Sequence, residues 1–244
     1  MLALIRGLLM VVLLFAVFIG TLLLCLVRPF HRDNVAVVAR WFARASCVVG
    51  LKIERRGLAH LSEQQPMVLV ANHQNNFDLF THASMVPKGT VSIGKKSLKW
   101  IPFFGQIYWL TGNILIDRAN ASKARSTIEN TTKSIRDKGL SVWIFPEGTR
   151  SYGRGLLPFK TGAFHTAINA GVPIVPVVAS CQQELRFGRW HNGTIIVEAL
   201  APISTAGMTS ADVRQLAQQV HQQMAEHFDK ISAEAQQLNA AKAA

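Results

Sequence analysis

The sequence contains few acidic residues and few cysteines, and it lacks the nucleophile motif of serine hydrolases. Asp and Glu number 14, against 26 Lys and Arg, among 244 residues. The three cysteines, Cys25, Cys47 and Cys181, are odd in number and widely spaced, which argues against a disulfide framework and against a metal site. We therefore expect buried free thiols in a reducing compartment. Gly-x-Ser-x-Gly is absent, which argues against a serine acyl-enzyme of the α/β-hydrolase kind.

The basic surplus is concentrated in the middle of the chain. The formal net charge is +12, and such a surplus implies an anionic partner, for which nucleic acid, anionic lipid headgroups and acidic substrates are candidates. Between Lys88 and Lys160 there are thirteen Lys and Arg but only four acidic residues. This region is therefore expected to face the anion, and the alternative is a basic surface that is merely solvated.

An uncharged run near the N-terminus predicts a membrane anchor. Gly7–Val27 carries no charge and is long enough to cross a hydrocarbon core of about 30 Å. A signal peptide would have a shorter apolar region and a small-x-small cleavage site, whereas Arg28-Pro29-Phe30 follows here. Arginines after the run outnumber the single Arg6 before it, which orients the rest of the chain toward the cytoplasm. They are Arg28, Arg32, Arg40 and Arg44.

The next segment, Val35–Val49, mixes apolar and aromatic residues with two arginines, a composition that suits a helix lying in the membrane interface. Two arrangements stay open, namely one spanning helix or a shallow two-helix hairpin that does not cross the bilayer. We expect residues 1–50 to form the anchor, residues 51–208 an α/β domain, and residues 209–244 a C-terminal amphipathic helix with a frayed tail.

From residue 51 onward, short apolar runs rich in β-branched residues alternate with helical patterns. Helices are predicted at 122–138 and 162–170, each followed by a glycine. In the C-terminal helix, apolar residues recur at three- and four-residue intervals from Val213 to Ile231. The alternation predicts a single α/β domain whose mostly parallel central sheet is flanked by helices. Strands are predicted at 51–55, 67–71, 91–94, 114–117, 142–145, 173–179 and 194–199.

His73 and Asp78 lie in the polar segment Asn72–Asp78, between a predicted strand and an apolar helical run at 79–86. Turns of this kind are where α/β folds present reactive groups. The spacing lets the Asp78 carboxylate meet one imidazole nitrogen, which leaves the other nitrogen free to accept a proton. Because no partner nucleophile is evident, we expect direct activation of a substrate hydroxyl. The alternative is that His73 is only a hydrogen-bonded turn residue and that Asp78 caps the helix.

A second polar segment, Phe145–Ser151, follows the apolar strand at 142–145. Proline ends the strand, Gly148 permits close backbone approach, and Arg150 can bind an oxyanion through two hydrogen bonds. Lys160 lies at the start of the next predicted helix, and a helix start itself favours anions. Taken alone, the segment fits a turn with solvated charges equally well.

Three further segments bear on the site. Gly112–Arg118 is a strand that ends on an arginine, and Gly171–Val178 is an apolar strand suited to the core or to the wall of an acyl-chain site. Gly89–Lys95 looks like most of a P-loop, but Lys96 stands where Ser or Thr must hold magnesium, so a nucleotide site is not expected. Lys95 and Lys96 are instead candidates for phosphate contacts.

In their order and spacing these segments resemble the four blocks of the glycerolipid acyltransferase family. The resemblance is strongest to bacterial members that acylate lysophosphatidate, and it covers nearly all of the chain. It implies transfer of a fatty acyl group from acyl-CoA or acyl carrier protein to the sn-2 hydroxyl of 1-acyl-glycerol-3-phosphate, giving phosphatidic acid for phospholipid biosynthesis. The blocks are Asn72–Asp78, Gly112–Arg118, Phe145–Arg150 and Val172–Val178, supported by the runs Gly94–Gly105 and Arg154–Gly162.

Carried over residue by residue, the resemblance implies that His73 is the general base and Asp78 the carboxylate that orients it. No metal or other cofactor is expected. The implied partners are lysophosphatidate, the acyl donor and the phospholipid bilayer of the bacterial inner membrane, with the catalytic domain on the cytoplasmic side and no nucleic acid. The residues expected at the acceptor and its phosphate are Glu147, Gly148, Thr149, Arg150 and Arg118, with Lys95, Lys96 and Lys160 as further contacts.

Three alternatives remain. The same chemistry could act on another lysolipid, such as a lyso-aminolipid. A thioesterase using the same His73–Asp78 pair would hydrolyse acyl-CoA without any acceptor. A basic nucleic-acid-binding protein would explain the charge but not the membrane segment, and its binding would weaken steeply with salt.

Overall fold

A computed structural model describes residues 1–61, 65–117 and 120–241 of the chain. Its centre is a seven-stranded sheet in the order β1-β7-β6-β2-β5-β3-β4. Neighbouring strands are parallel except for β6 and β7. Each predicted strand is present to within one residue at either end, and the mostly parallel α/β architecture is confirmed. The strands are β1 (Leu51–Arg56), β2 (Val68–Ala71), β3 (Thr90–Lys95), β4 (Ile114–Ile116), β5 (Ser141–Ile144), β6 (Ile174–Ala179) and β7 (Gly193–Ala199).

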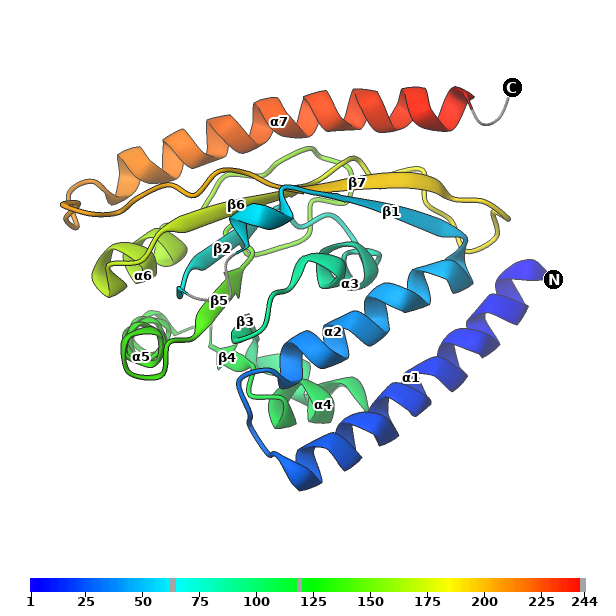
Figure 1. Ribbon diagram of the computed structural model, residues 1–244, viewed down its shortest axis with the longest axis horizontal. Helices are drawn as coiled ribbons and strands as arrows, with labels where there is room; N and C mark the ends of the chain where they lie inside the picture. The colour runs from blue at the N-terminus through cyan, green and yellow to red at the C-terminus, as the bar shows by residue number, and fades with distance from the viewer. Residues whose placement is uncertain (62–64, 118–119, 242–244) are drawn as a thin grey trace.

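Helices cover both faces of this sheet (Figure 1). They are α1 (Leu2–Val27), α2 (Asn34–Arg44), α3 (Asp78–Thr81), α4 (Phe104–Leu110), α5 (Ala121–Lys138), α6 (Gly162–Ala170) and α7 (Val213–Ala241), with 3₁₀ turns η1 (Ala45–Val49), η2 (Leu58–His60), η3 (His82–Met85) and η4 (Lys96–Trp100). Val68 and Val70 of β2 pack under α5, α6 and α7, whereas Leu69 and Ala71 face α3 and η1 on the other side. Strands buried on both faces explain the unbroken apolar runs in the sequence.

Helices α5 and α6 begin and end within one residue of the predicted positions. The side chain of Asn120 accepts a hydrogen bond from the backbone N–H of Lys123 at the start of α5. Gly139 and Gly171 end α5 and α6 with φ of 58° and 68°, a conformation that costs glycine little. The helical run expected at 79–86 is instead a single α-helical turn, α3, followed by the 3₁₀ turn η3.

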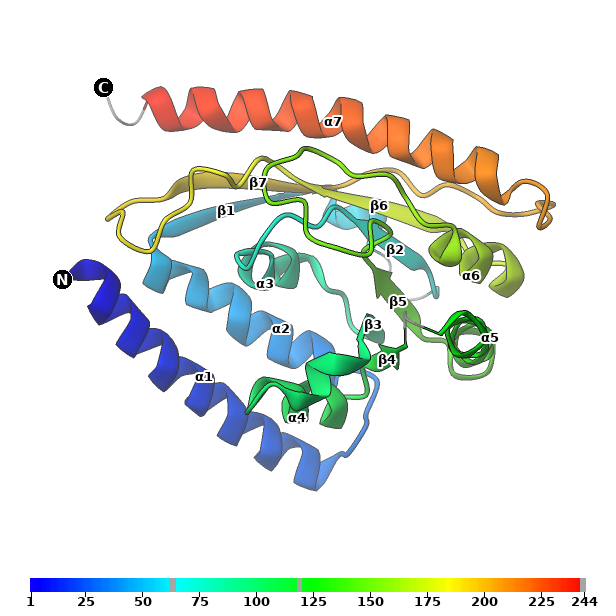
Figure 2. The same ribbon diagram turned by 180° about the vertical axis from the view of Figure 1, so that it is seen from behind.

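At the N-terminus, α1 and α2 form an antiparallel hairpin on the face of the domain opposite α7 (Figures 1 and 2). Helix α1 is long and apolar enough to cross a membrane by length and composition. One side of α1 packs on the domain through Met10 and Val17, near Phe42 of α2. Its other side exposes large apolar residues, which indicates membrane association; they include Leu4, Leu8, Phe15, Leu23 and Leu26.

The cysteines are all free thiols, as expected, but the expectation that they are buried is only partly correct. Cys25 is buried against the backbone of Leu110 in α4. Cys47 is exposed because it lies in the surface turn η1, and Cys181 is partly exposed just after β6. A cysteine in an apolar stretch of sequence can thus face solvent where that stretch forms a turn.

Candidate active site

The two polar segments singled out in the sequence lie side by side at one edge of the sheet. One follows β2 and the other follows β5, and these strands are parallel neighbours paired from Val68 with Val142 to Val70 with Ile144. On the far side of β5, β3 and β4 run in the same direction, so Lys95, the last residue of β3, lies at the same edge. With neighbouring strands about 4.8 Å apart, the ends of β2, β5, β3 and β4 form a row along the carboxyl edge of the sheet, where α/β folds bind ligands.

In the first segment, Nδ1 of His73 lies 2.7 Å from Oδ2 of Asp78. A carboxylate can only accept a hydrogen bond, so the proton sits on Nδ1 and the lone pair remains at Nε2. Nε2 makes no hydrogen bond to any residue that the structure describes, and the His73 side chain is 20% exposed. The imidazole stacks on Phe145, with ring centroids 4.1 Å apart. The ring is therefore held in place with a basic nitrogen open to a substrate.

Four donors hold the Asp78 carboxylate. Besides His73, the backbone N–H groups of Gln74 and Asn75 donate to Oδ2 at 2.7 and 3.2 Å, and Nε2 of Gln182 donates to Oδ1 at 2.9 Å. The alternative in which Asp78 only caps the helix is wrong. Asp78 is the first residue of α3, and its carboxylate binds backbone groups of the turn before the helix. That turn folds back on Asp78, which brings His73 to the carboxylate.

Glu147, in the second segment, is 4% exposed and joins the two segments. Its Oε1 accepts from the backbone N–H of His73 at 2.6 Å, and its Oε2 accepts from the N–H of Leu157 at 3.0 Å. Burial raises the pKa of Glu147 to about 7, although the two N–H donors oppose the shift. With both of its carboxylate oxygens bound to the protein's own backbone, Glu147 connects the backbone of the His73 turn to that of Leu157.

Two backbone hydrogen bonds add to this connection. The N–H of Ser151 donates to the carbonyl oxygen of His73 at 2.8 Å, and the N–H of Tyr152 donates to that of Gln74 at 2.9 Å. The N–H of Lys160 donates to the carbonyl oxygen of Pro146 at 2.9 Å, which joins the two ends of the loop after β5. The imidazole and the Arg150 loop are therefore parts of one hydrogen-bonded unit.

The predicted cations of the second segment lie in the same loop. Arg150 is partly exposed, and its buried Nε has no hydrogen-bond partner among the described residues. Thr149 and Lys160 are exposed. A Cβ on Gly148 would lie 3.0 Å from Nζ of Lys160, so glycine at this position leaves room for that side chain. The loop thus carries both an arginine and a lysine, and the lysine side chain lies over Gly148.

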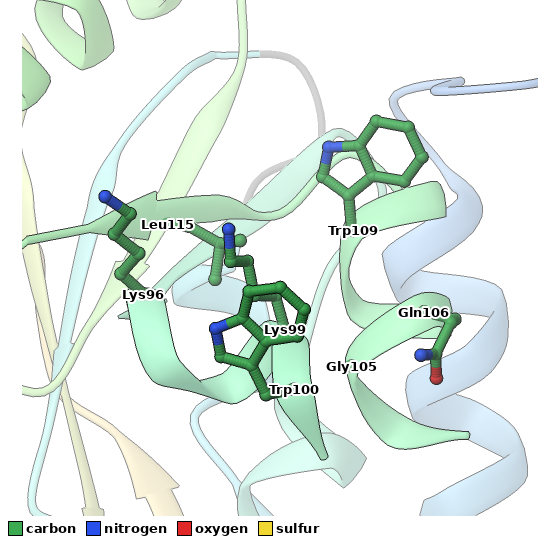
Figure 3. Close-up of a pocket in the computed structure, with 7 residues that line it drawn as sticks. All are labelled: Lys96, Lys99, Trp100, Gly105, Gln106, Trp109 and Leu115. Carbon is green, nitrogen blue, oxygen red and sulfur yellow. The ribbon is translucent and has the colours of Figure 1, made fainter. Parts of the chain in front are cut away.

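The remaining predicted cations lie toward β3 and β4. Lys95 and Lys96 are exposed at the end of β3, and Nζ of Lys96 lies 3.7 Å from Oδ2 of Asp117. Arg118 lies outside the described residues. A hollow of about 460 Å³ opens at this end of the row, lined by Lys96, Lys99, Trp100, Gly105, Gln106, Trp109 and Leu115 (Figure 3).

Sequence reasoning missed three buried residues behind the His73–Asp78 pair. Gln74 donates to the carbonyl oxygens of Ala179 and Ser180, and it accepts from the N–H of Gln182. His82 lies with Nε2 3.8 Å from Oδ1 of Asp78, and burial lowers its pKa, which keeps the ring neutral. Its spacing of four residues from Asp78 was a usable signal. Gln182 gave no signal, because only the pairing of β6 with β2 brings it near Asp78.

The described residues contain no group of three His, Cys, Asp or Glu side chains that could hold a metal ion. What they offer is an oriented imidazole beside a loop of cations, at the open edge of a parallel sheet. Such a site suits proton removal from a hydroxyl close to an anionic group.

Comparison with known proteins identifies the family to which the chain belongs. Residues 52–180 match the family model described as Acyltransferase, and the chain belongs to this family. It is 46% identical to the 1-acyl-sn-glycerol-3-phosphate acyltransferase of Haemophilus influenzae over 229 residues, which cover 91% of this chain and 95% of that protein. It is also 46% identical to the protein of the same name from Escherichia coli (strain K12) over 218 residues, 89% of each chain.

A solved structure shares the fold. The crystal structure of the 1-acyl-sn-glycerophosphate (LPA) acyltransferase, PlsC, from Thermotoga maritima matches with a TM-score of 0.72 at 21% identity. The match covers 95% of this chain and 98% of that chain, so it includes most of the N-terminal hairpin as well as the α/β domain. The family resemblance noted in the sequence is confirmed.

Proposed function

We propose that this chain is an acyltransferase that moves a fatty acyl group from a thioester to the sn-2 hydroxyl of 1-acyl-sn-glycerol-3-phosphate, forming phosphatidic acid for phospholipid biosynthesis. The observation that carries the proposal is the identity of 46% to bacterial enzymes of that name over about nine-tenths of the chain. The oriented pair His73 and Asp78 supplies the chemistry that this reaction needs.

In the proposed mechanism, Nε2 of His73 removes the proton from the sn-2 hydroxyl while the hydroxyl oxygen attacks the thioester carbonyl carbon. Asp78 stabilises the imidazolium that forms and keeps the ring oriented. When the tetrahedral intermediate collapses, the carbon–sulfur bond breaks, and the leaving thiolate takes the proton from His73. The ester bond replaces the thioester bond, and the enzyme returns to its starting state without a covalent intermediate or a metal.

The phosphate of the acceptor is proposed to bind the cations along the carboxyl edge. Arg150 can donate two parallel hydrogen bonds to phosphate oxygens, and its unpartnered Nε supports this role. The Lys160 side chain lies beside Gly148 in the same loop, and Lys95 and Lys96 lie two strands from β2. Arg118, which follows β4, is proposed to complete the phosphate site.

Glu147 is proposed to act indirectly. Its carboxylate is bound to the backbone of His73 and Leu157, so it can keep the base and the Arg150 loop in register. Gly148 and Thr149 are proposed to shape the acceptor side of the same loop.

The acyl donor is acyl-CoA or acyl carrier protein, both of which present a thioester. The bilayer is the proposed second partner, since the acceptor is a lipid and α1 exposes an apolar side. The arginines after α1 support a position at the bacterial inner membrane with the α/β domain on the cytoplasmic side. Residues 1–50 then serve as the anchor, 51–208 as the catalytic domain and 209–244 as the C-terminal segment, whose helix α7 covers the sheet.

The test is an assay of the purified protein in detergent with acyl-labelled donor, with and without lysophosphatidate, followed by identification of the lipid product. We expect label in phosphatidic acid only when the acceptor is present. Release of labelled fatty acid at the same rate without acceptor would identify a thioesterase. Label in another lysolipid, offered as a competitor at equal concentration, would change the assigned acceptor.

A further inference from the structure

A group of exposed aromatic side chains lies on η4 and α4, outside the His73 site. Trp100, Phe103 and Trp109 are each more than half exposed, as is Phe30 between α1 and α2. Together with Lys99, we call these residues the aromatic patch. A cluster of large apolar side chains on one surface indicates an interaction site, whereas isolated ones do not.

The aromatic patch is continuous with the exposed side of α1. The ring of Phe103 packs edge-on against Phe18 and Phe15 of α1, with centroids 5.1 and 6.3 Å apart. The ring of Phe30 packs in the same way on Trp109, at 5.2 Å. Figure 1 shows α4 beside the C-terminal half of α1. One apolar surface therefore extends from α1 across α4 to Trp100.

Two members of the aromatic patch have an unfavourable backbone conformation. Phe30 and Phe103 have φ of 53° and 62°, a conformation that bulky side chains rarely adopt. Such strain persists where the surrounding structure enforces it, often at functional sites. In Phe103 the contacts with α1 provide that enforcement.

The chemistry around the aromatic patch suits a membrane surface with negative charge. Nζ of Lys99 lies 4.5 Å from the centre of the Trp100 ring. Lys95, Lys96 and Lys99 line two adjoining hollows here, in which Asp117 is the single acidic residue among the described ones. Tryptophan is enriched where hydrocarbon meets headgroups, and basic side chains beside it attract anionic lipids. Figure 3 shows Trp100 and Trp109 coming from separate segments, with Lys96 and Lys99 on the same segment as Trp100.

We propose that the aromatic patch is a second membrane-contact surface, which inserts Trp100, Phe103 and Trp109 into the interface of a bilayer that contains anionic phospholipid. The inference rests on the proposed lipid acceptor, and it adds how the domain lies relative to the bilayer that contains this acceptor. Because η4 directly follows β3, the carboxyl edge that carries His73 faces the bilayer, and the acceptor reaches the site without leaving the interface. Helix α1 supplies the anchor, and the aromatic patch sets the tilt of the domain.

The first experiment locates the patch relative to the bilayer in the full chain. Trp100→Cys and Trp109→Cys, each made with Cys47→Ser and Cys181→Ala, carry an environment-sensitive dye. Gln222→Cys on the exposed side of α7 is the matched control. In vesicles of phosphatidylethanolamine and phosphatidylglycerol with brominated acyl chains, the two patch dyes should be quenched by the lipid and shielded from aqueous iodide. Quenching of both by iodide, as for the α7 dye, would overturn the proposal.

The second experiment separates this surface from the catalytic site. The double variant Trp100→Ser, Trp109→Ser should keep turnover within about twofold on a short-chain lysophosphatidate that stays monomeric in water. Its KM for acceptor embedded in the same vesicles should rise about tenfold, as expected when interfacial anchors are lost. Leu58→Ser, another exposed apolar residue, should change neither value.

Other outcomes of this assay contradict the proposal in distinct ways. Equal loss on both acceptors places the tryptophans in the substrate site. A rise confined to the KM for an acyl carrier protein makes the patch a protein docking surface. If the wild type acylates neither acceptor, the proposed function fails, while the dye positions still report whether the patch meets the bilayer.

Discussion

The side-chain amide of Gln182 donates a 2.9 Å hydrogen bond to Oδ1 of Asp78, although the two residues are 104 positions apart. Gln182 is almost fully buried, and the same Nε2 also lies 3.2 Å from Oγ1 of Thr81. The contact holds the carboxylate from the side opposite His73. Orientation of the base therefore depends on a residue after β6 as well as on the turn that contains it.

Replacement of Gln182 should lower kcat without changing either KM. A hydrogen bond to a charged group contributes roughly 1.5–3 kcal/mol, so Gln182→Leu should reduce kcat about 10- to 100-fold, and Gln182→Asn should recover part of the loss. Steady-state kinetics with both substrates, beside the α7 surface variant Gln218→Ala, measure the effect. A purely structural role would instead lower the melting temperature with kcat per folded molecule unchanged.

Arg150→Ala should weaken binding of the acceptor. Loss of one or two charge-assisted hydrogen bonds, at roughly 1.5–3 kcal/mol each, should raise the KM for lysophosphatidate at least tenfold and leave the KM for acyl-CoA nearly constant. Arg150→Lys should recover only part, because lysine cannot form the bidentate contact. The exposed α7 variant Arg214→Ala is the control. If only the donor KM changes, this loop belongs to the donor site.

The raised pKa of Glu147 predicts how stability depends on pH. Because its pKa in the folded protein, about 7, lies above the ordinary 4.5, the folded state binds this proton more tightly than the unfolded chain. The stabilisation of the folded state by this tighter proton binding is fully present below pH 4.5 and is lost as pH rises through 7. It amounts to roughly 3 kcal/mol at about 1.4 kcal/mol per pH unit. From about pH 5 to pH 8 the melting temperature of wild type should fall relative to that of Glu147→Gln, because glutamine stays neutral while Glu147 becomes charged in a buried position. A constant difference would contradict the assignment.

Deletion of α1 alone should give a folded protein that leaves the membrane, whereas a longer deletion should give an aggregated one. A chain that starts at Arg28 keeps α2, whose buried Val38 and Phe42 cover part of the domain, so it should fold. It should bind vesicles weakly and dissociate in high salt. A chain that starts at Leu51 also loses Val49 from the core and should aggregate. Sedimentation with carbonate-washed membranes distinguishes these results, and full retention of the shorter deletion would show that α1 is not the anchor.

Much of this fold could be predicted because its central strands have a clear sequence pattern. Strands β2, β5 and β6 are short, fully buried runs rich in β-branched residues, and parallel neighbours buried on both faces require such runs. Helix α4 escaped prediction because its sequence, Phe104–Leu110, is short and aromatic and lacks a helical stripe of its own. Its position depends on contacts with α1, which are far away in sequence.

Part of the geometry of the candidate site could be predicted too. The spacing of His73 and Asp78 indicated their contact, because both residues belong to one turn. The role of Glu147 as a backbone acceptor could not be seen, since it depends on the register of β2 and β5. For the same reason Gln182 could not be predicted, because its contact with Asp78 exists only once β6 pairs with β2.

The rate of phosphatidic acid formation by His73→Ala tests the central claim most directly. We expect kcat to fall roughly 10²–10⁴-fold, the usual contribution of general base catalysis, with membrane association and melting temperature unchanged. His191→Ala, which removes an exposed histidine from the loop before β7, should retain full activity. Near-normal formation of phosphatidic acid by the His73→Ala protein would show that His73 is not the base and that the proposed mechanism is wrong.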